Sequence, residues 1–222
     1  MTERDTVLRD LALRLIELAA SRTDGDLSGT VPIVRAGHPA LRGVATPYDG
    51  QLDTGELAAL LTLMHRTMRE APGVGLAAPQ VGLPLALAVV EDPGAVDPET
   101  ARVREREPVP YRVLVNPRYA AHGDERVGFY EGCLSVPGYH AVVARHRAVH
   151  LTGADETGRP LDEVVTGWHA RIVQHETDHL LGTLYLDRAE PASLAAADDL
   201  GVRWASEPRP DAAARALGFT LP

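Results

Sequence analysis

The spacing H-E-x-x-H of a helical metal site occurs at His175-Glu176-Thr177-Asp178-His179. In a helix, two histidines four residues apart project from one face, about one turn apart, and can bind one metal ion. A glutamate next to the first histidine lies beside that face, where it can take a proton from water at the metal. The alternative is a polar helix surface with two solvated histidines. The spacing favours a metal-dependent hydrolytic site.

The third ligand must come from elsewhere, because a catalytic site of this type uses three protein ligands and leaves one position for water. The only cysteine of the chain stands in the run Glu131-Gly132-Cys133-Leu134-Ser135. Cys133 could be a metal ligand, a nucleophile with a histidine base, or part of an ordinary turn before a strand. The nucleophile hypothesis must explain the H-E-x-x-H spacing separately, whereas the ligand hypothesis uses both features.

Glycines and small residues form a third patch, in the run Gly73-Val74-Gly75-Leu76-Ala77-Ala78-Pro79-Gln80. Such a loop can cradle a phosphate, but its spacing does not fit G-x-G-x-x-G and no Gly-Lys-Ser follows. The other interpretation is a segment that admits a bound peptide backbone close to the protein chain. Gln80 could then supply an amide donor to developing negative charge.

Together and in chain order, these runs resemble the peptide deformylase family, which is marked by G-x-G-x-A-A-x-Q, E-G-C-x-S and H-E-x-x-H segments. The resemblance covers roughly residues 31–188, and no motif position that carries chemistry in the family is substituted. It implies a metal-dependent hydrolase that removes the formyl group from the N-terminal formyl-methionine of newly synthesised polypeptides and releases formate. The implied partners are N-formylmethionyl nascent peptides. Transient contact with the ribosome is left open, and binding to DNA or to a membrane is not expected.

The resemblance also implies roles for the metal-site residues. Cys133, His175 and His179 hold one divalent metal ion, and water fills the fourth position. The family typically uses ferrous iron, and zinc, nickel or cobalt can occupy the same site; the donor set suits all of these ions. Glu176 removes a proton from the water and later returns it to the leaving amine.

Further roles concern the substrate. The Gln80 amide and the Leu134 backbone N–H stabilise charge on the formyl oxygen. The peptide backbone runs as an added strand against the Val74-Gly75 and Gly132-Cys133 segments. The candidates for the wall of an apolar methionine pocket are Val74, Glu131, Leu134 and His175, with Trp168 and Ile172 as second contributors.

Two nearby residues have expected roles outside the chemistry. The resemblance implies that Asp178 pairs with Arg145 and anchors the metal helix, whereas most Asp residues are surface carboxylates. His140 follows the Cys133 segment closely enough to edge the substrate groove.

Two other classes of function compete with this interpretation. A zinc peptidase usually takes its third ligand downstream of the helix, where residues 180–188 offer Asp187 and no histidine. A non-catalytic binding protein on the same fold would be signalled by loss of Glu176, Gln80 or a ligand, and all are present. Assays on a formyl-peptide and on an internal amide separate these classes.

The composition limits which partners the protein can bind and in which cellular compartment it is expected. The chain has 222 residues, a formal net charge of −9 and one cysteine, so a broad basic face for nucleic acid is not expected. An internal disulfide or a zinc finger built on several cysteines is excluded. No apolar run is long enough to span a bilayer, and the first residues lack the apolar core of a secretion signal. We expect a cytoplasmic protein.

Three helices are expected to position these residues. Leucines at spacings of three and four predict an amphipathic helix over residues 6–20. A second helix is expected at 54–70, with Asp53 and Glu56 as a capping box. The metal motif lies on a third, at 167–181, with Thr166 as N-cap and Gly182 as the stop. Apolar residues on two sides of this third helix indicate that it is buried.

Strands and loops complete the expected organisation. Strands are expected at residues 85–90, 111–116, 141–152 and 160–165. A linker is expected at 23–30, a long exposed loop at 91–110, and a weakly helical or partly disordered tail after Arg188.

The expected fold class is α+β, with short antiparallel or mixed strands wrapped around a central metal-binding helix, as in the resembled family. We divide the chain into an N-terminal helical extension and linker (1–30), a catalytic domain (31–188) and a C-terminal tail (189–222).

Overall fold

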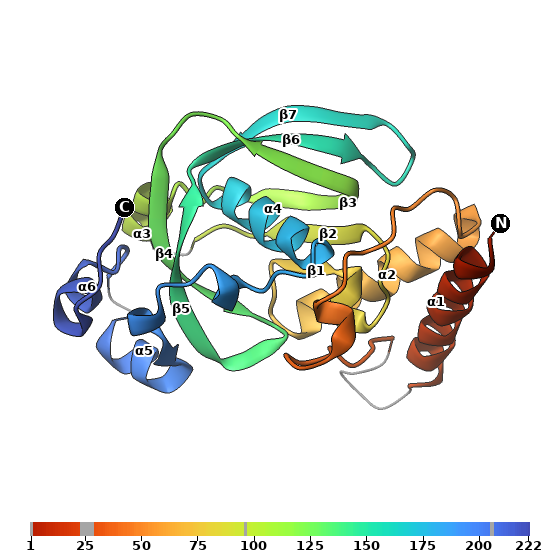
Figure 1. The fold of residues 1–222 in the computed structure, drawn as a ribbon, viewed down its shortest axis with the longest axis horizontal. Helices are drawn as coiled ribbons and strands as arrows, with labels where there is room; N and C mark the ends of the chain where they lie inside the picture. Colours follow the sequence, from red (N-terminus) through yellow and green to blue (C-terminus); the bar gives the residue numbers. More distant parts are fainter. Residues whose placement is uncertain (1, 23–28, 96, 205–206) are drawn as a thin grey trace.

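A computed structural model describes the chain except for residues 1, 23–28, 96 and 205–206, which include most of the expected linker. It is an α+β fold with two antiparallel sheets, as expected (Figure 1). One sheet has the order β1-β2-β3-β6-β7 and the other β4-β5-β8. The strands are β1 (Gly75–Ala77), β2 (Leu87–Asp92), β3 (Val109–Ala121), β4 (Arg126–Cys133), β5 (Val136–His146), β6 (Ala148–Ala154), β7 (Pro160–Thr166) and β8 (Ala195–Ala196).

The helices include all three that the sequence predicts. They are α1 (Glu3–Ser21), α2 (Thr54–Glu70), α3 (Pro98–Arg104), α4 (Gly167–Leu180), α5 (Ala197–Arg203) and α6 (Asp211–Leu217), with 3-10 turns η2 (Pro39–Leu41), η3 (Ala78–Val81), η4 (Tyr185–Asp187) and η5 (Pro191–Ser193). No described helix has the length and apolar character needed to cross a bilayer.

Helix α4 lies in the middle of the molecule and packs against strands of both sheets (Figure 1). Thr166 occupies the N-cap position but makes no side-chain capping hydrogen bond. Gly182, with a φ of 75°, follows the helix as expected, because a left-handed residue commonly ends a helix. The metal motif therefore sits on a buried, well-bounded element.

Helices α1 and α2 pack together on the face of the larger sheet opposite α4 (Figure 1). The predicted capping box of α2 is confirmed, with Asp53 and Glu56 bonded reciprocally to each other's backbone N–H. Leu8, Ala12 and Ala19 of α1 are buried in the same apolar cluster as the inner face of α2. The N-terminal helix is thus part of the core rather than a detached arm.

The expected strands differ from the observed ones mainly at their ends. The expected run at 141–152 is two strands, because the chain turns at Arg147 between β5 and β6. Strands β1 and β4 were not expected. Both carry glycines within the runs that the sequence analysis singles out, Gly75 in β1 and Gly132 in β4, and glycine weakens the sequence signal of a strand.

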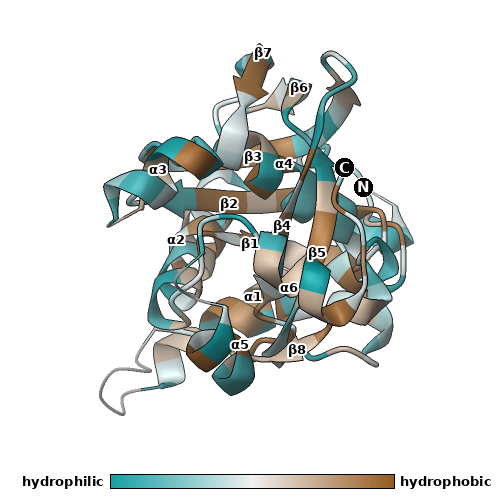
Figure 2. Cartoon of the chain, turned by 90° about the vertical axis from the view of Figure 1, so that its left-hand side faces the viewer, coloured by the Kyte–Doolittle hydropathy of each residue, from teal (hydrophilic) through white to brown (hydrophobic). Residues whose placement is uncertain are grey.

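The prediction of a long exposed loop at 91–110 is wrong. Asp92 ends β2, is buried, and forms a two-bond ion pair with Arg106 at 2.9 Å. Asp97 then caps α3, with Pro98 in the first turn. This signal, an N-cap Asp before Pro, stood in the sequence; the surrounding charge obscured it. In Figure 2, α3 is mostly hydrophilic, whereas β2 carries the hydrophobic colour of the core.

The tail after Arg188 is more ordered than expected in its described part. Strand β8 pairs with β5, through Tyr139 with Ala196 and His140 with Ala195. Helices α5 and α6 follow. Beyond α6, Phe219 is buried against Val142 of β5. The tail therefore wraps the smaller sheet.

Candidate metal centre

Three possible metal ligands converge where β4 meets α4. Cys133 ends β4, and His175 and His179 lie one turn apart on α4; their ligand atoms all fall within 4.8 Å of one another. Cys133 Sγ is 3.2 Å from His179 Nε2. In the part of the chain that the structure describes, no other group of three such side chains is found. The structure thus brings together the three residues that the sequence points to.

The protonation of the two rings differs. Burial and the nearby His175 hold the pKa of His179 well below its usual value, so this ring is neutral and can bind a cation. Burial opposes charge on His175 as well, but hydrogen bonds to Cys133 and Glu131 raise its pKa to about 10. A cation that binds here must displace that proton, as metals do at thiol and imidazole sites.

The donor set fits a divalent metal. One thiolate and two imidazoles suit borderline-soft ions such as iron, cobalt, nickel and zinc. His175 Nδ1 is hydrogen bonded to Glu131 at 3.0 Å, which fixes the ring and leaves Nε2 for a metal. Within the described structure, Glu176 Oε2 is buried without a hydrogen-bond partner. An unpaired buried oxygen beside such donors is expected where a water or an ion belongs.

Gln80 is held so that its amide donor faces the ligands. It lies in η3 and is 1% exposed. Its Oε1 accepts a hydrogen bond from the Ala77 backbone N–H at 2.8 Å. Its Nε2 is 3.6 Å from Cys133 Sγ and 3.3 Å from Ser135 Oγ. The expected amide donor is thus oriented before any substrate binds.

Glu176 is a buried carboxyl beside a glycine. It is 4% exposed, and burial is the main cause that raises its pKa to about 7. A group with this pKa can both accept and return a proton near neutral pH. A Cβ at Gly75 would lie 2.2 Å from Glu176 Oε1. Gly75 is therefore needed to make room for this carboxylate.

The Glu131 carboxylate is hydrogen bonded to charged neighbours. Its carboxylate accepts two hydrogen bonds from Arg145, at 2.6 and 2.9 Å, and one from Arg171 at 2.6 Å. Burial opposes its ionisation, but these partners outweigh burial and hold its pKa well below the usual range. Its ionised oxygens orient His175, so the stem of Glu131 is the part available to line a pocket.

Asp178 anchors α4 from the side away from the ligands. It is 1% exposed, and Arg145 Nη1 donates to it at 2.7 Å, which confirms the expected pair and rules out a surface carboxylate. Arg188 adds two hydrogen bonds, at 2.7 and 2.9 Å, and the Tyr119 hydroxyl one at 3.0 Å. Arg145 thus links Asp178 to Glu131.

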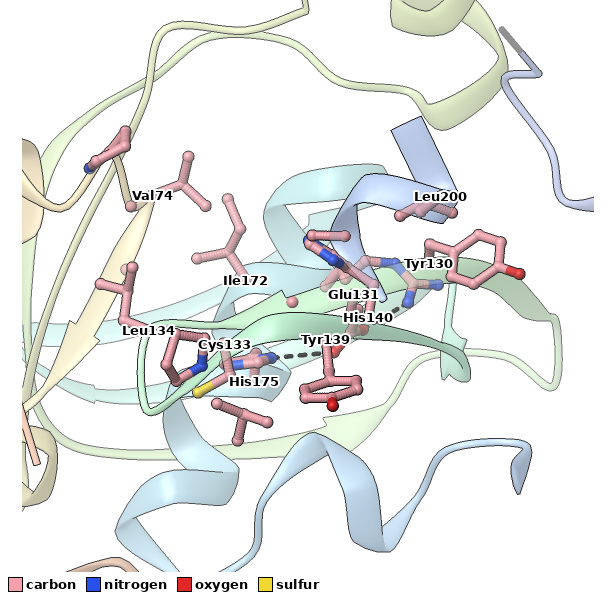
Figure 3. A pocket seen from close by; sticks show the side chains of 18 of the residues that line it. Val74, Tyr130, Glu131, Cys133, Leu134, Tyr139, His140, Ile172, His175 and Leu200 are labelled. Atoms are coloured by element: carbon pink, nitrogen blue, oxygen red, sulfur yellow. Dashed lines mark hydrogen bonds and ion pairs between the residues drawn. The ribbon is translucent and has the colours of Figure 1, made fainter. Parts of the chain in front are cut away.

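A cavity of 780 Å³ opens beside the ligands (Figure 3). Every residue that the sequence suggests for the chemistry or the substrate lines it, with the exception of His179, which lies deeper; these are Val74, Gly75, Gln80, Glu131, Gly132, Cys133, Leu134, Trp168, Ile172, His175 and Glu176. His140 also lines the cavity, as suggested. The three distant sequence runs thus form one site.

Sequence reasoning missed several residues of this cavity. Arg171 lies one turn before His175 on α4, a spacing that could have revealed it. It bonds Glu131 and stacks over Phe129, with its guanidinium carbon 5.2 Å from the ring centre. Arg104 and Arg106 come from the segment taken for a loop, and Leu200 and Trp204 come from the tail. No sequence motif pointed to Arg104, Arg106, Leu200 or Trp204.

Asp187, the candidate third metal ligand of the zinc-peptidase alternative, lies outside the ligand cluster. Asp187 hydrogen bonds to Arg42 and to the Leu184 backbone N–H, and it is not part of the Cys133 cluster.

Comparisons with known proteins identify relatives over most of the chain. A family model described as polypeptide deformylase matches residues 30–194. The chain is 58% identical to peptide deformylase 3 of Streptomyces avermitilis, over 96% of this chain and 92% of that protein. It is 40% identical to the human mitochondrial peptide deformylase, over 57% of this chain and 54% of that one.

Solved structures give the same result. A Met-Ala-Ser-bound class I type b peptide deformylase from Acinetobacter baumannii superposes with a TM-score of 0.64 at 35% identity, over 72% of this chain and 98% of that one. A Synechococcus elongatus peptide deformylase in complex with actinonin gives a TM-score of 0.62 at 31% identity, over 86% of this chain and 87% of the other.

Proposed function

The chain belongs to the polypeptide deformylase family, and from this premise we propose how its own residues perform the reaction. The enzyme is a metal-dependent hydrolase that removes the formyl group from formyl-methionine at the N-terminus of new polypeptides. The observation that carries the assignment of residues is the cluster of Cys133, His175 and His179 beside Gln80 and Glu176 in one cavity.

Cys133, His175 and His179 are the proposed metal ligands. When bound, the divalent cation supplies a nucleophile at neutral pH by lowering the pKa of water, from about 15.7 to about 7 in well-studied cases. Ferrous iron is the proposed native ion, and zinc, nickel and cobalt are the competitors that the donor set also suits. Elemental analysis of protein purified without oxygen identifies the ion.

Glu176 is the proposed acid and base. Its buried carboxylate, with a pKa of about 7, takes the proton as the formyl carbon is attacked and passes it to the leaving amino group. Both proton transfers are short if one carboxylate oxygen of Glu176 faces the water and the amine. Glu176 Oε2 is free to take this position, because it has no hydrogen-bond partner among the described groups.

Gln80 Nε2 and the Leu134 backbone N–H are the proposed donors to the formyl oxygen. The hydrogen bond from Ala77 fixes the Gln80 side chain, so no reorganisation is needed when negative charge develops. One such donor is worth about 10²–10³ in rate.

The peptide is proposed to bind as a strand between two sheet edges. Strand β1 ends one sheet and β4 ends the other, and neither has a second strand neighbour among the described residues. Residues of both strands line the cavity, including Gly75 and Gly132. An extended peptide can add to such edges through main-chain hydrogen bonds. The bound Met-Ala-Ser of the Acinetobacter relative supports a peptide of this size here.

The methionine side chain is proposed to enter the cavity between β1 and α4. Val74 and Ile172 face each other there (Figure 3), and Trp168 lies one turn before Ile172 on α4. Leu134 and the stem of Glu131 complete the proposed wall.

The cytoplasm is the proposed location, because the substrate emerges at the ribosome. Contact with the ribosome is proposed to be transient, and co-sedimentation with ribosomes at low and high salt tests it.

The test of the assignment is formate release from formyl-Met-Ala-Ser by wild type and Glu176→Ala, with metal content measured on both. The variant is expected to lose at least 10²-fold in kcat while it keeps the metal, because all three ligands remain. Near-normal turnover of Glu176→Ala would overturn the role of this residue.

A further inference from the structure

The cavity extends well past the metal ligands and the proposed methionine pocket. At one end lie Val74 and Leu134, and at the other lie Tyr130 and Leu200 (Figure 3). A volume of 780 Å³ is in the range of sites for whole drug-sized ligands, about 300–1,000 Å³. One methionine side chain and a formyl group leave much of this space unused.

The far end is built by the C-terminal tail. Strand β8 pairs with β5 at Tyr139 and His140, and α5 begins at the next residue, so this pairing places α5 along the wall of the cavity. Leu200 of α5 lines the cavity, whereas Val202 on the same helix is 87% exposed. The helix therefore has one side toward the cavity and one toward solvent.

This wall is held from two sides. Arg104, at the end of α3, donates from Nε to the Pro208 carbonyl at 2.9 Å. Its guanidinium stacks over Trp168, with 5.4 Å between the guanidinium carbon and the ring centre. Trp204, just after α5, packs with Val142 and Phe219 in the tail's apolar cluster. The wall is thus organised before substrate binds, and α5 lies outside the segment that the family model matches.

The proposed function sets the direction of the peptide. The formyl oxygen is placed at Leu134 and the backbone against Gly132, so residues that follow methionine run back along β4 toward Tyr130. An extended chain advances about 3.3 Å per residue, so the third and fourth residues approach the far end of the cavity. There, Tyr130, Leu200 and Trp204 form the wall.

The far end offers apolar contact rather than a charge preference. Three charged residues lie there, and each has a partner within the protein. Arg104 donates to the Pro208 carbonyl, Arg106 forms an ion pair with Asp92, and Glu207 accepts a hydrogen bond from the Ala212 N–H at 3.0 Å. Aromatic and aliphatic faces fill the rest.

We propose that α5 and Trp204, with Tyr130, form an apolar subsite that reads the third or fourth residue of the formyl-peptide and favours an aromatic or large aliphatic side chain. The proposal rests on the proposed function, since it takes its peptide direction from there. It assigns to the tail a role in substrate selection for the same reaction.

The test compares kcat/KM for formyl-Met-Ala-Ala-Ala with peptides that carry one phenylalanine at the second, third or fourth position. Wild type is expected to favour phenylalanine at the third or fourth position by about three- to tenfold, the size of one aromatic contact. The gain should appear in KM, because this contact is the same in the ground and transition states. Equal kcat/KM for all four peptides would overturn the proposal.

Variants assign the preference to the wall. For Leu200→Ala, the ratio of kcat/KM between the best phenylalanine peptide and the alanine peptide is expected to fall to about one. For Leu200→Asp, that ratio is expected to fall below one. Val202→Asp, on the solvent side of the same helix, should keep the wild-type ratio. Melting temperatures of all three variants show that they are folded. A Leu200→Ala enzyme with an unchanged ratio refutes the subsite, whereas failure of wild type to release formate from any of the peptides refutes the proposed function itself.

Discussion

At the scale of single residues, Gln80 shows how the backbone can orient a proposed catalytic group. One end of its amide is tied to the Ala77 N–H, and the other faces Cys133. The same amide therefore stabilises η3 and is available to a substrate oxygen. Its role and that of Glu176 could be proposed from motif spacing, because each residue type has few chemical uses beside a metal.

Gln80→Leu is expected to lower kcat by about 10²–10³-fold with a smaller change in KM, because the donor is needed mainly as charge develops. Steady-state kinetics with formyl-Met-Ala-Ser measure both constants. Ser135→Ala removes the other polar partner of Gln80 Nε2 and serves as the control, with less than a tenfold loss expected. A Gln80→Leu enzyme changed in KM alone would indicate ground-state peptide binding instead.

Gly75→Ala tests the space around Glu176. The added Cβ would lie 2.2 Å from Glu176 Oε1, so the carboxylate must move, and a displacement of about 1 Å can cost about 10²-fold in rate. We expect that loss in kcat, with the metal still bound. Gly43→Ala, where an added Cβ meets nothing within 4 Å, should leave kcat unchanged. Full activity of Gly75→Ala would show that Glu176 tolerates another position.

The geometry around the ligands was less accessible to sequence. Arg145 and Arg171 both donate hydrogen bonds to Glu131, but Arg145 was expected only as the partner of Asp178 and Arg171 was not expected at all. Arg171 reaches Glu131 across the space between α4 and β4, and this contact depends on how the two elements pack rather than on any local pattern. Buried ion pairs of this kind are set by tertiary structure.

At the scale of elements, periodicity and capping predicted the long helices well. Helix α2 begins and ends where the sequence places it, because Asp53, Glu56 and an apolar stripe agree. Strand β4 was missed because two glycines, Gly128 and Gly132, interrupt it. Its pairing with β5 supplies the stability that local propensity does not.

Helix α1 provides a stability test at this scale. Leu8 is 3% exposed in the cluster shared with α2, and Val7 beside it is 54% exposed. Leu8→Ala is expected to lower the free energy of unfolding by about 2–5 kcal/mol, and Val7→Ala to change it by less than about 0.5 kcal/mol. Urea unfolding of both variants measures this difference. Equal stabilities would mean that α1 does not pack on α2 in solution.

At the scale of the whole molecule, the extension, the catalytic segment and the tail share cores. The division into an N-terminal helical extension and linker (1–30), a catalytic domain (31–188) and a C-terminal tail (189–222) stays a proposal. The extension packs on α2 and the tail on β5, so neither is expected to detach. These contacts could not be predicted, because a sequence pattern shows which helix face is apolar but not what covers it.

The proposed metal centre joins the smaller sheet, which supplies Cys133, to the central helix, which supplies both histidines. A ligand that binds only the folded state stabilises it by RT ln(1 + [L]/Kd), about 2.7 kcal/mol at one hundred times Kd. Removal of the metal with a chelator is therefore expected to lower the melting temperature, and added nickel or cobalt to restore it, with a shift that grows with the logarithm of the metal concentration. Cys133→Ser replaces a thiolate with a neutral hydroxyl, so its melting temperature should respond much less to the same additions. Scanning fluorimetry with elemental analysis measures both effects. If Cys133→Ser keeps full metal occupancy and the wild-type dependence on metal, Cys133 is a structural cysteine and the ligand assignment is wrong.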